Sequence, residues 1–90
     1  MDVREQFGRL LREARMTKGL TQEELAFRAG MSVPYLSEVE RGRPSPSLTM
    51  MVDLAIALEI HLADLVRPMT MERAQHDGGR KRPQDEGTNG

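Results

Sequence analysis

The chain has 90 residues, of which 38% are hydrophobic and 30% are charged, and its formal net charge is −1 at pH 7. This length suits one small domain, whose core must be mainly aliphatic because only two Phe and one Tyr are present. The lack of cysteine excludes disulfides and thiolate metal sites, and the sequence has neither a signal-peptide pattern nor an apolar run long enough to span a membrane. We therefore expect a cytoplasmic protein.

A first helix is predicted over residues 3–18. Asp2 suits its start and Lys18 its end, because each charge opposes the helix dipole at that position. Gly19 provides a natural stop. The apolar residues of this segment recur at helical spacing and form one stripe, which consists of Val3, Phe7, Leu10, Leu11 and Ala14.

Residues 21–42 predict two short helices joined by a tight turn. The first covers about residues 22–29, and Thr21 and Glu24, three residues apart, form a capping-box pattern at its start. Gly30 ends this helix, because glycine readily adopts the positive φ that a tight turn requires.

The second helix of this pair is expected to follow Ser32, a favourable N-cap residue, and to end before Gly42. Pro34 is tolerated in its first turn, where the backbone N–H lacks a helical partner in any case. Leu36 and Val39, three residues apart, direct one apolar face toward the preceding helix. Two helices arranged in this way form a helix-turn-helix, whose second helix can enter a DNA major groove.

Two further helices are expected after a stiff loop that contains Pro44 and Pro46. Ser47 is predicted to cap a helix that runs to about Glu59, and a short last helix covers about residues 62–66. The inward stripe of the longer helix is predicted to be Leu48, Met51, Leu54 or Ala55, and Leu58.

Residues 68–90 differ in composition from the rest of the chain. They are rich in Gly, Pro, Gln, Asp and Arg, and they contain almost no apolar residue after Met71. Such a segment cannot bury enough surface to offset the entropy of ordering, so we expect a disordered polar tail after a folded domain at residues 1–67. The basic cluster at residues 80–82 is either a phosphate contact or part of a solvated tail.

The run GLTQEELAFRAGMSVPYLSEVERG, followed by PSL and LAIALEI, resembles the phage-repressor and Cro type of helix-turn-helix regulator, often called the Xre type. The resemblance covers about residues 4–66. It implies an all-α, compact five-helix, lambda-repressor-like domain that binds double-stranded DNA, with the helix at about residues 32–41 in the major groove. It also implies a small dimeric regulator, either an (auto)repressor or a controller of the restriction-modification type, that recognises a partly palindromic operator.

The resemblance also assigns roles to individual residues. The positions at which relatives read bases are occupied by Val33, Pro34, Tyr35, Ser37 and Glu38. The positions at which relatives contact phosphates are occupied by Thr21, Gln22, Arg41, Arg43, Ser45 and Ser47. Two further positions, Arg15 and Glu40, match a pair that links the first and third helices in relatives, and we expect this pair to be structural.

Three of the base-reading positions depart from the Gln, Arg or Lys that many relatives carry. Val33 and Pro34 can meet a thymine methyl group, but their side chains cannot hydrogen-bond a base edge. Glu38 can accept a hydrogen bond from cytosine N4, whereas near a phosphate it would be repelled. Tyr35 is open to two interpretations, packing at the domain edge or contact with the DNA backbone.

The charge balance leaves a second function open. Residues 1–66 contain eight basic and ten acidic residues, so affinity for DNA must come from a local arrangement of charge. The alternative is a helical protein–protein interaction module, such as an antitoxin or co-regulator subunit, which the apolar pair Val33 and Pro34 favours. If the protein dimerises, the region from Ile60 to Val66 is the expected contact.

Enzyme chemistry finds little support in the sequence. It contains no Gly-rich phosphate loop, no His-Glu pair at ligand spacing and no nucleophile elbow. His61 and His76 are isolated from other ligands, so we expect neither a metal nor another cofactor. The chain offers no separate effector domain, and no small-molecule effector is expected.

Overall fold

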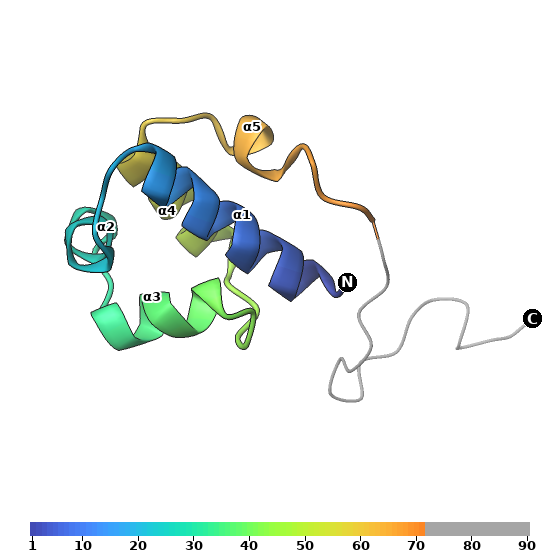
Figure 1. Cartoon of the computed structure of the whole chain (residues 1–90), viewed down its shortest axis with the longest axis horizontal. Coiled ribbons are helices and arrows are strands. Elements are labelled where there is room, and N and C mark those ends of the chain that lie inside the picture. The colour runs from blue at the N-terminus through green and yellow to red at the C-terminus, as the bar shows by residue number, and fades with distance from the viewer. Residues whose placement is uncertain (72–90) are drawn as a thin grey trace, which may run out of the picture.

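The computed structural model describes residues 1–71, and it contains five helices and no strand in this part of the chain. Their order in space is shown in Figure 1. The helices are α1 (Val3–Thr17), α2 (Gln22–Ala29), α3 (Val33–Glu40), α4 (Leu48–Leu58) and α5 (Leu62–Val66). This confirms the predicted all-α fold, and each helix lies close to its predicted limits. The predicted tail from residue 72 onward lies outside the described residues.

The helix starts follow from the capping residues identified in the sequence. Thr21 Oγ1 accepts a hydrogen bond from Glu24 N at 3.0 Å, and Glu24 Oε1 accepts one from Thr21 N at 2.8 Å, which completes the capping box. Ser32 and Ser47 cap α3 and α4 in the same way through their hydroxyl oxygens. These local bonds satisfy backbone N–H groups that have no partner within the helix.

One aliphatic core holds the helices together. α1 packs against α3 and α5, while α2 packs against α3 and α4. The side chains that are 1% exposed or less are Leu11, Leu25, Ala26, Leu36, Val39, Leu54 and Leu58. Burial of these side chains is the main stabilising contribution to a domain of this size.

Two glycines allow α1 to approach the end of α3 closely. A Cβ atom on Gly8 would lie 2.4 Å from the carbonyl oxygen of Val39, so no larger residue fits there without movement of the backbone. Gly42 has φ +79°, and a Cβ on it would lie 2.7 Å from Cα of Glu5. The sequence indicated Gly42 as the end of a helix, but it gave no sign that Gly8 is a contact between helices.

The predicted inward position of Leu48 is wrong, because this side chain is 66% exposed. Leu48 is the first residue of α4, and the buried residues of this helix, Leu54, Ala55, Ala57 and Leu58, all lie in its second half. Leu48 instead shares an exposed face of α4 with Val52 and Ile56, which are 37% and 68% exposed.

The chain continues to pack against the domain after α5. Met69 lies against the core, and Thr70 N donates to Gln6 Oε1 at 2.7 Å. Gln6 Nε2 donates to the carbonyl oxygens of Thr70 and Met1, at 3.1 and 2.8 Å. The packed part of the chain therefore includes residues beyond 67, the predicted end of the domain. Within residues 1–71, no helix is long and apolar enough to cross a membrane.

Candidate nucleic-acid interface

The turn between α2 and α3 fixes the angle at which α3 leaves the domain. Gly30 adopts φ +72°, and the next residue, Met31, donates its N–H to the carbonyl oxygen of Ala26 at 3.0 Å. Leu36 and Val39 are buried on one side of α3. The opposite side of α3 is therefore left to face solvent, as a DNA-reading helix requires.

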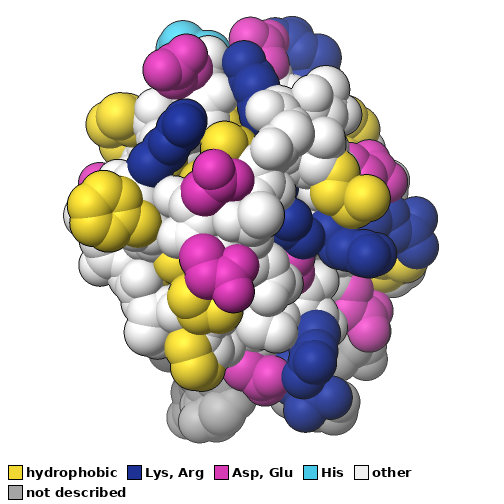
Figure 2. All heavy atoms as spheres, turned by 60° about the vertical axis from the view of Figure 1, so that its left-hand side comes forward, with side chains coloured by type: hydrophobic (Ala, Val, Ile, Leu, Met, Phe, Trp, Pro, Cys, Tyr) yellow, Lys and Arg dark blue, Asp and Glu magenta, His cyan; other side chains and the backbone are white. Residues whose placement is uncertain are grey.

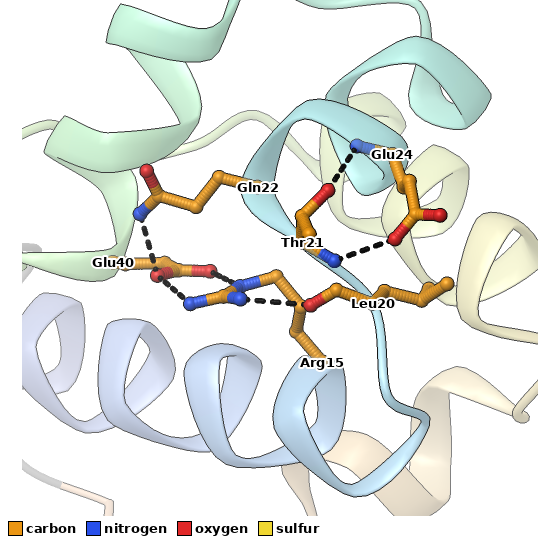
Figure 3. A network of polar contacts seen from close by, with 6 residues as sticks. All are labelled: Arg15, Leu20, Thr21, Gln22, Glu24 and Glu40. Atoms are coloured by element: carbon orange, nitrogen blue, oxygen red, sulfur yellow. Dashed lines mark hydrogen bonds and ion pairs between the residues drawn. The ribbon is translucent and has the colours of Figure 1, made fainter.

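A buried ion pair ties α1 to the end of α3. Arg15 Nε lies 2.7 Å from Glu40 Oε2, and a second guanidinium nitrogen donates to Glu40 Oε1 at 3.1 Å (Figure 3). The side chains of Arg15 and Glu40 are only 12% and 4% exposed. A third nitrogen of Arg15 donates to the carbonyl oxygen of Leu20 at 2.9 Å, which anchors the segment that leads into α2. The expected partners are thus in bidentate contact.

Gln22, the predicted phosphate contact at the start of α2, joins the same network. Its Nε2 donates to Glu40 Oε1 at 3.0 Å, and Figure 3 shows its amide lying over the Arg15–Glu40 pair. An amide nitrogen carries two protons, so one remains for another acceptor. The network fixes the N-terminus of α2 against the C-terminus of α3. The sequence did not indicate this link, because 18 residues separate Gln22 from Glu40.

The five predicted base-reading residues are not equally accessible. Pro34 is exposed, and Ser37 and Glu38 are partly exposed on α3. Val33 was expected to point outward, but it is partly buried and packs against the core. Tyr35 is also partly buried against the core, which favours packing at the domain edge and leaves part of its ring accessible.

The end of α3 folds back on itself through a Schellman motif. Arg43 N donates to the carbonyl oxygen of Glu38 at 3.1 Å, and Gly42 N donates to that of Val39 at 3.0 Å. This geometry brings the Arg43 side chain beside Glu38, with 3.8 Å between Arg43 Nη1 and Glu38 Oε1. Arg41 Nη1 lies 3.1 Å from the other carboxylate oxygen, Oε2.

Glu38 thus faces both arginines that were predicted to contact phosphates. All three side chains are well exposed, with 40% exposure for Glu38 and 60% and 67% for Arg41 and Arg43. The three-residue spacing of Glu38 and Arg41 is a helical ion-pair spacing, so the sequence contained a signal for this contact. The contact with Arg43 depends on the positive φ of Gly42 and could not be found from spacing alone.

The hydroxyl groups predicted to contact phosphates lie at helix starts. Ser45 and Ser47 are both exposed, and Ser47 Oγ accepts from Met50 N at 3.1 Å, which leaves its own proton available. Thr21 is also exposed, at the start of α2, and its Oγ1 accepts from Glu24 N at 3.0 Å. Hydrogen bonds from Thr21 lower the pKa of Glu24 below its ordinary value.

The surface around these helices has no single strong charge. In Figure 2 the Lys and Arg side chains of the visible face are interspersed with Asp and Glu. Among residues 1–71, no three His, Asp or Glu side chains are grouped so that they could hold a metal ion. The arrangement offers exposed arginines, hydroxyls and helix N-termini, which are suited to phosphate oxygens.

These features define a small DNA-binding regulator in which α2 and α3 form the helix-turn-helix. Residues 11–65 match the helix-turn-helix family, and the chain belongs to that family. This confirms the expected family resemblance. The protein is therefore a DNA-binding transcriptional regulator and not an enzyme.

Individual relatives agree with this assignment. The chain is 44% identical over 68 residues to the uncharacterised HTH-type transcriptional regulator y4dJ of Sinorhizobium fredii, covering 76% of this chain and 88% of that protein. It is 44% identical over 61 residues to the transcriptional regulator ClgR of Mycobacterium tuberculosis, covering 68% of this chain and 54% of ClgR. The chain thus spans only about half the length of that relative.

Solved structures show the same fold. The restriction-modification controller protein C.AhdI of Aeromonas hydrophila is 45% identical with a TM-score of 0.67, and the match covers 69% of this chain and 94% of that chain. The clp gene regulator ClgR of Corynebacterium glutamicum is 39% identical with a TM-score of 0.73, and the match covers 74% and 71% of the two chains. None of these relatives favours the alternative of a protein–protein interaction module.

Proposed function

We propose that the protein is a small dimeric repressor that binds a partly palindromic operator, either at its own gene or at a restriction-modification operon. Similarity to C.AhdI, a restriction-modification controller matched over 94% of its chain, supports the second possibility. In this proposal α3 of each protomer enters one major groove, with half-sites about 34–36 Å apart. The regulator acts in the cytoplasm, where its operator is accessible.

The observation that carries this proposal is the network that fixes Gln22 at the end of α3. A helix-turn-helix reads DNA as a rigid unit, in which phosphate contacts set the register of the reading helix. Glu40 bonds both Arg15 and Gln22, so the start of α2 cannot move independently of α3. Gln22 is thereby held where the N-terminus of α2 can meet a phosphate.

The remaining residues take complementary roles in this proposal. The exposed parts of α3 read the bases through Pro34, Tyr35, Ser37 and Glu38, with a smaller contribution from the partly buried Val33. Phosphate oxygens on either side of the groove are contacted by Thr21, Gln22, Arg41, Arg43, Ser45 and Ser47. Two of these residues, Thr21 and Ser47, stand at N-caps, where helix amides add to the attraction for an anion.

The proposed dimer uses the region from Ile60 to Val66. Ile60, Leu62 and Val66 are partly buried against the core, so only part of each side chain remains for a second copy. Ile56, in the last turn of α4 and 68% exposed, offers a further apolar side chain four positions before Ile60. In our proposal the folded unit consists of residues 1–67 together with the following segment up to Thr70, whose backbone bonds to the Gln6 side chain.

The test is binding of labelled duplexes, measured by fluorescence anisotropy across a salt series. The duplexes are the region upstream of the gene and sequences selected by the protein from a random pool. Arg43→Ala should weaken binding and reduce the slope of log K against log salt by about 0.9 for each protomer, or about 1.8 for the proposed dimer, because one phosphate contact is lost at each half-site. Arg12→Ala, a matched change at an exposed position on α1, should leave the slope unchanged.

Failure to bind any of these duplexes would refute the proposal and would direct the search toward a protein partner. If the Arg43→Ala and Arg12→Ala variants bind DNA with equal salt slopes, the protein is still a DNA-binding protein, but Arg43 does not contact a phosphate.

A further inference from the structure

Glu38 occupies an unusual place for an acidic residue in a surface that binds DNA. Its Oε2 accepts from Arg41 at 3.1 Å, while its Oε1 lies 3.8 Å from Arg43 Nη1. Each carboxylate oxygen therefore faces one of the two cations proposed to hold phosphates. A phosphate group also binds guanidinium groups through its oxygens, so the carboxylate and a phosphate can bind the same two arginines.

The backbone fixes this arrangement more firmly than surface side chains usually allow. Arg41 N and Arg43 N both donate to the carbonyl oxygen of Glu38, at 3.2 and 3.1 Å. Gly42, with φ +79°, turns the chain so that Arg43 returns over the last turn of α3. The backbone N–H groups of both arginines are therefore bonded to Glu38, the residue whose side chain the two guanidinium groups face.

A phosphate and Glu38 compete for the same cations. While both arginines face Glu38, the three side chains present a net charge of +1 to DNA in place of +2, and the carboxylate itself repels a nearby phosphate. The competition changes if a base supplies a hydrogen-bond donor to Glu38. Cytosine N4 is such a donor in the major groove. The carboxylate then turns to the base, and both guanidinium groups become available to phosphates.

We infer that Glu38 is a specificity-determining residue that withholds Arg41 and Arg43 from DNA phosphates unless a cytosine in the major groove engages its carboxylate. This inference rests on the proposed function. It couples base reading to phosphate binding, so a duplex without the matching cytosine loses the base contact and two phosphate contacts together. It also gives a near-neutral domain a means to limit its affinity for arbitrary DNA.

The test compares two duplexes, one of random sequence with about 40 base pairs and one selected by the parent protein from a random pool. Glu38→Gln keeps the size of the side chain and removes its charge. For each protomer bound, it should tighten binding to the random duplex by about 2- to 30-fold, the range that corresponds to two exposed ion pairs. The salt slope on that duplex should steepen by up to about 1.8 for each bound protomer, or about 3.6 for a dimer with both protomers on the DNA, which corresponds to two added phosphate contacts per protomer.

Two sets of variants separate this effect from a general gain of positive charge. Glu13→Gln removes one charge from an exposed position of α1, a helix that supplies none of the proposed DNA contacts. This variant should leave the salt slope unchanged on both duplexes. Arg41→Ala with Arg43→Ala should cancel the gain when combined with Glu38→Gln. The same pair of changes should weaken the parent much more on the selected duplex than on the random duplex.

The selected duplex tests the role of the base. Each G·C pair of the selected duplex is replaced in turn by A·T. Replacement at one position, and at the position related to it by the symmetry of the operator, should weaken DNA binding by the parent protein but not by the Glu38→Gln variant. Equal tightening on both duplexes would overturn the inference, as would a Glu38→Gln protein that matches Glu13→Gln. In either case DNA binding itself would stand. A parent protein that binds neither duplex would refute the proposed function and this inference together.

Discussion

The buried ion pair between Arg15 and Glu40 makes a strong prediction about stability. Arg15→Met keeps much of the apolar stem, but within residues 1–71 it leaves the Glu40 carboxylate, whose side chain is 4% exposed, with the Gln22 amide as its one side-chain partner. Breaking a buried pair by removal of one partner costs about 3–5 kcal/mol. Domains are stable by about 5–15 kcal/mol in total, so this change should remove a large part of the free energy of unfolding.

The assay is urea unfolding followed by far-ultraviolet circular dichroism, which reports the five helices directly. The matched control is Arg15→Met combined with Glu40→Leu, which removes both charges. This double variant should regain at least about 2 kcal/mol relative to the single variant, because no buried charge is left unpaired. A single variant within about 1 kcal/mol of the parent, or a double variant less stable than the single one, would refute the reasoning.

Three further predictions follow from other contacts. Gly8→Ala should destabilise the protein by about 1–3 kcal/mol in urea unfolding, because its new methyl group meets the carbonyl oxygen of Val39; an unchanged unfolding midpoint would contradict the close approach of α1 to α3. Glu24 has a lowered pKa in the folded state, so its contribution to stability is present above the unfolded-state pKa and is lost as pH falls through the folded-state pKa. The stability difference between the parent and Glu24→Gln should therefore shrink on acidification, as seen by thermal unfolding at several pH values, and a constant difference would exclude this linkage. Ile56→Glu should weaken self-association in sedimentation experiments and leave the helical signal intact, whereas an unchanged mass distribution would exclude this face of α4 from the dimer.

The sequence predicted the helices well because their limits depend on local chemistry. The capping box of Thr21 and Glu24, the cap at Ser47 and the left-handed turn at Gly30 involve residues within a few positions of one another. Such bonds are set by residue type and short spacing, so a pattern of capping residues and glycines is sufficient to locate them.

Contacts between distant parts of the chain were not predictable in the same way. Gly8 is an ordinary residue in the sequence of α1, and its close approach to Val39 exists only after α1 has packed on α3. The family resemblance gave Val33 a base-reading position, but the neighbouring core covers part of its side chain. The individual DNA contacts remain predictions, because spacing along α3 indicates which residues share a face and not which base each one meets.

The amide of Gln6 has a consequence for how the protein can be rebuilt. It bonds the carbonyl oxygens of Met1 and Thr70, so the start of the chain and the end of the packed segment lie next to each other, as Figure 1 shows. Neighbouring ends are what a circular permutation requires. A short linker between them, with new ends opened in the loop before Ser47, would keep every helix and cut the connection between the DNA-reading pair and α4.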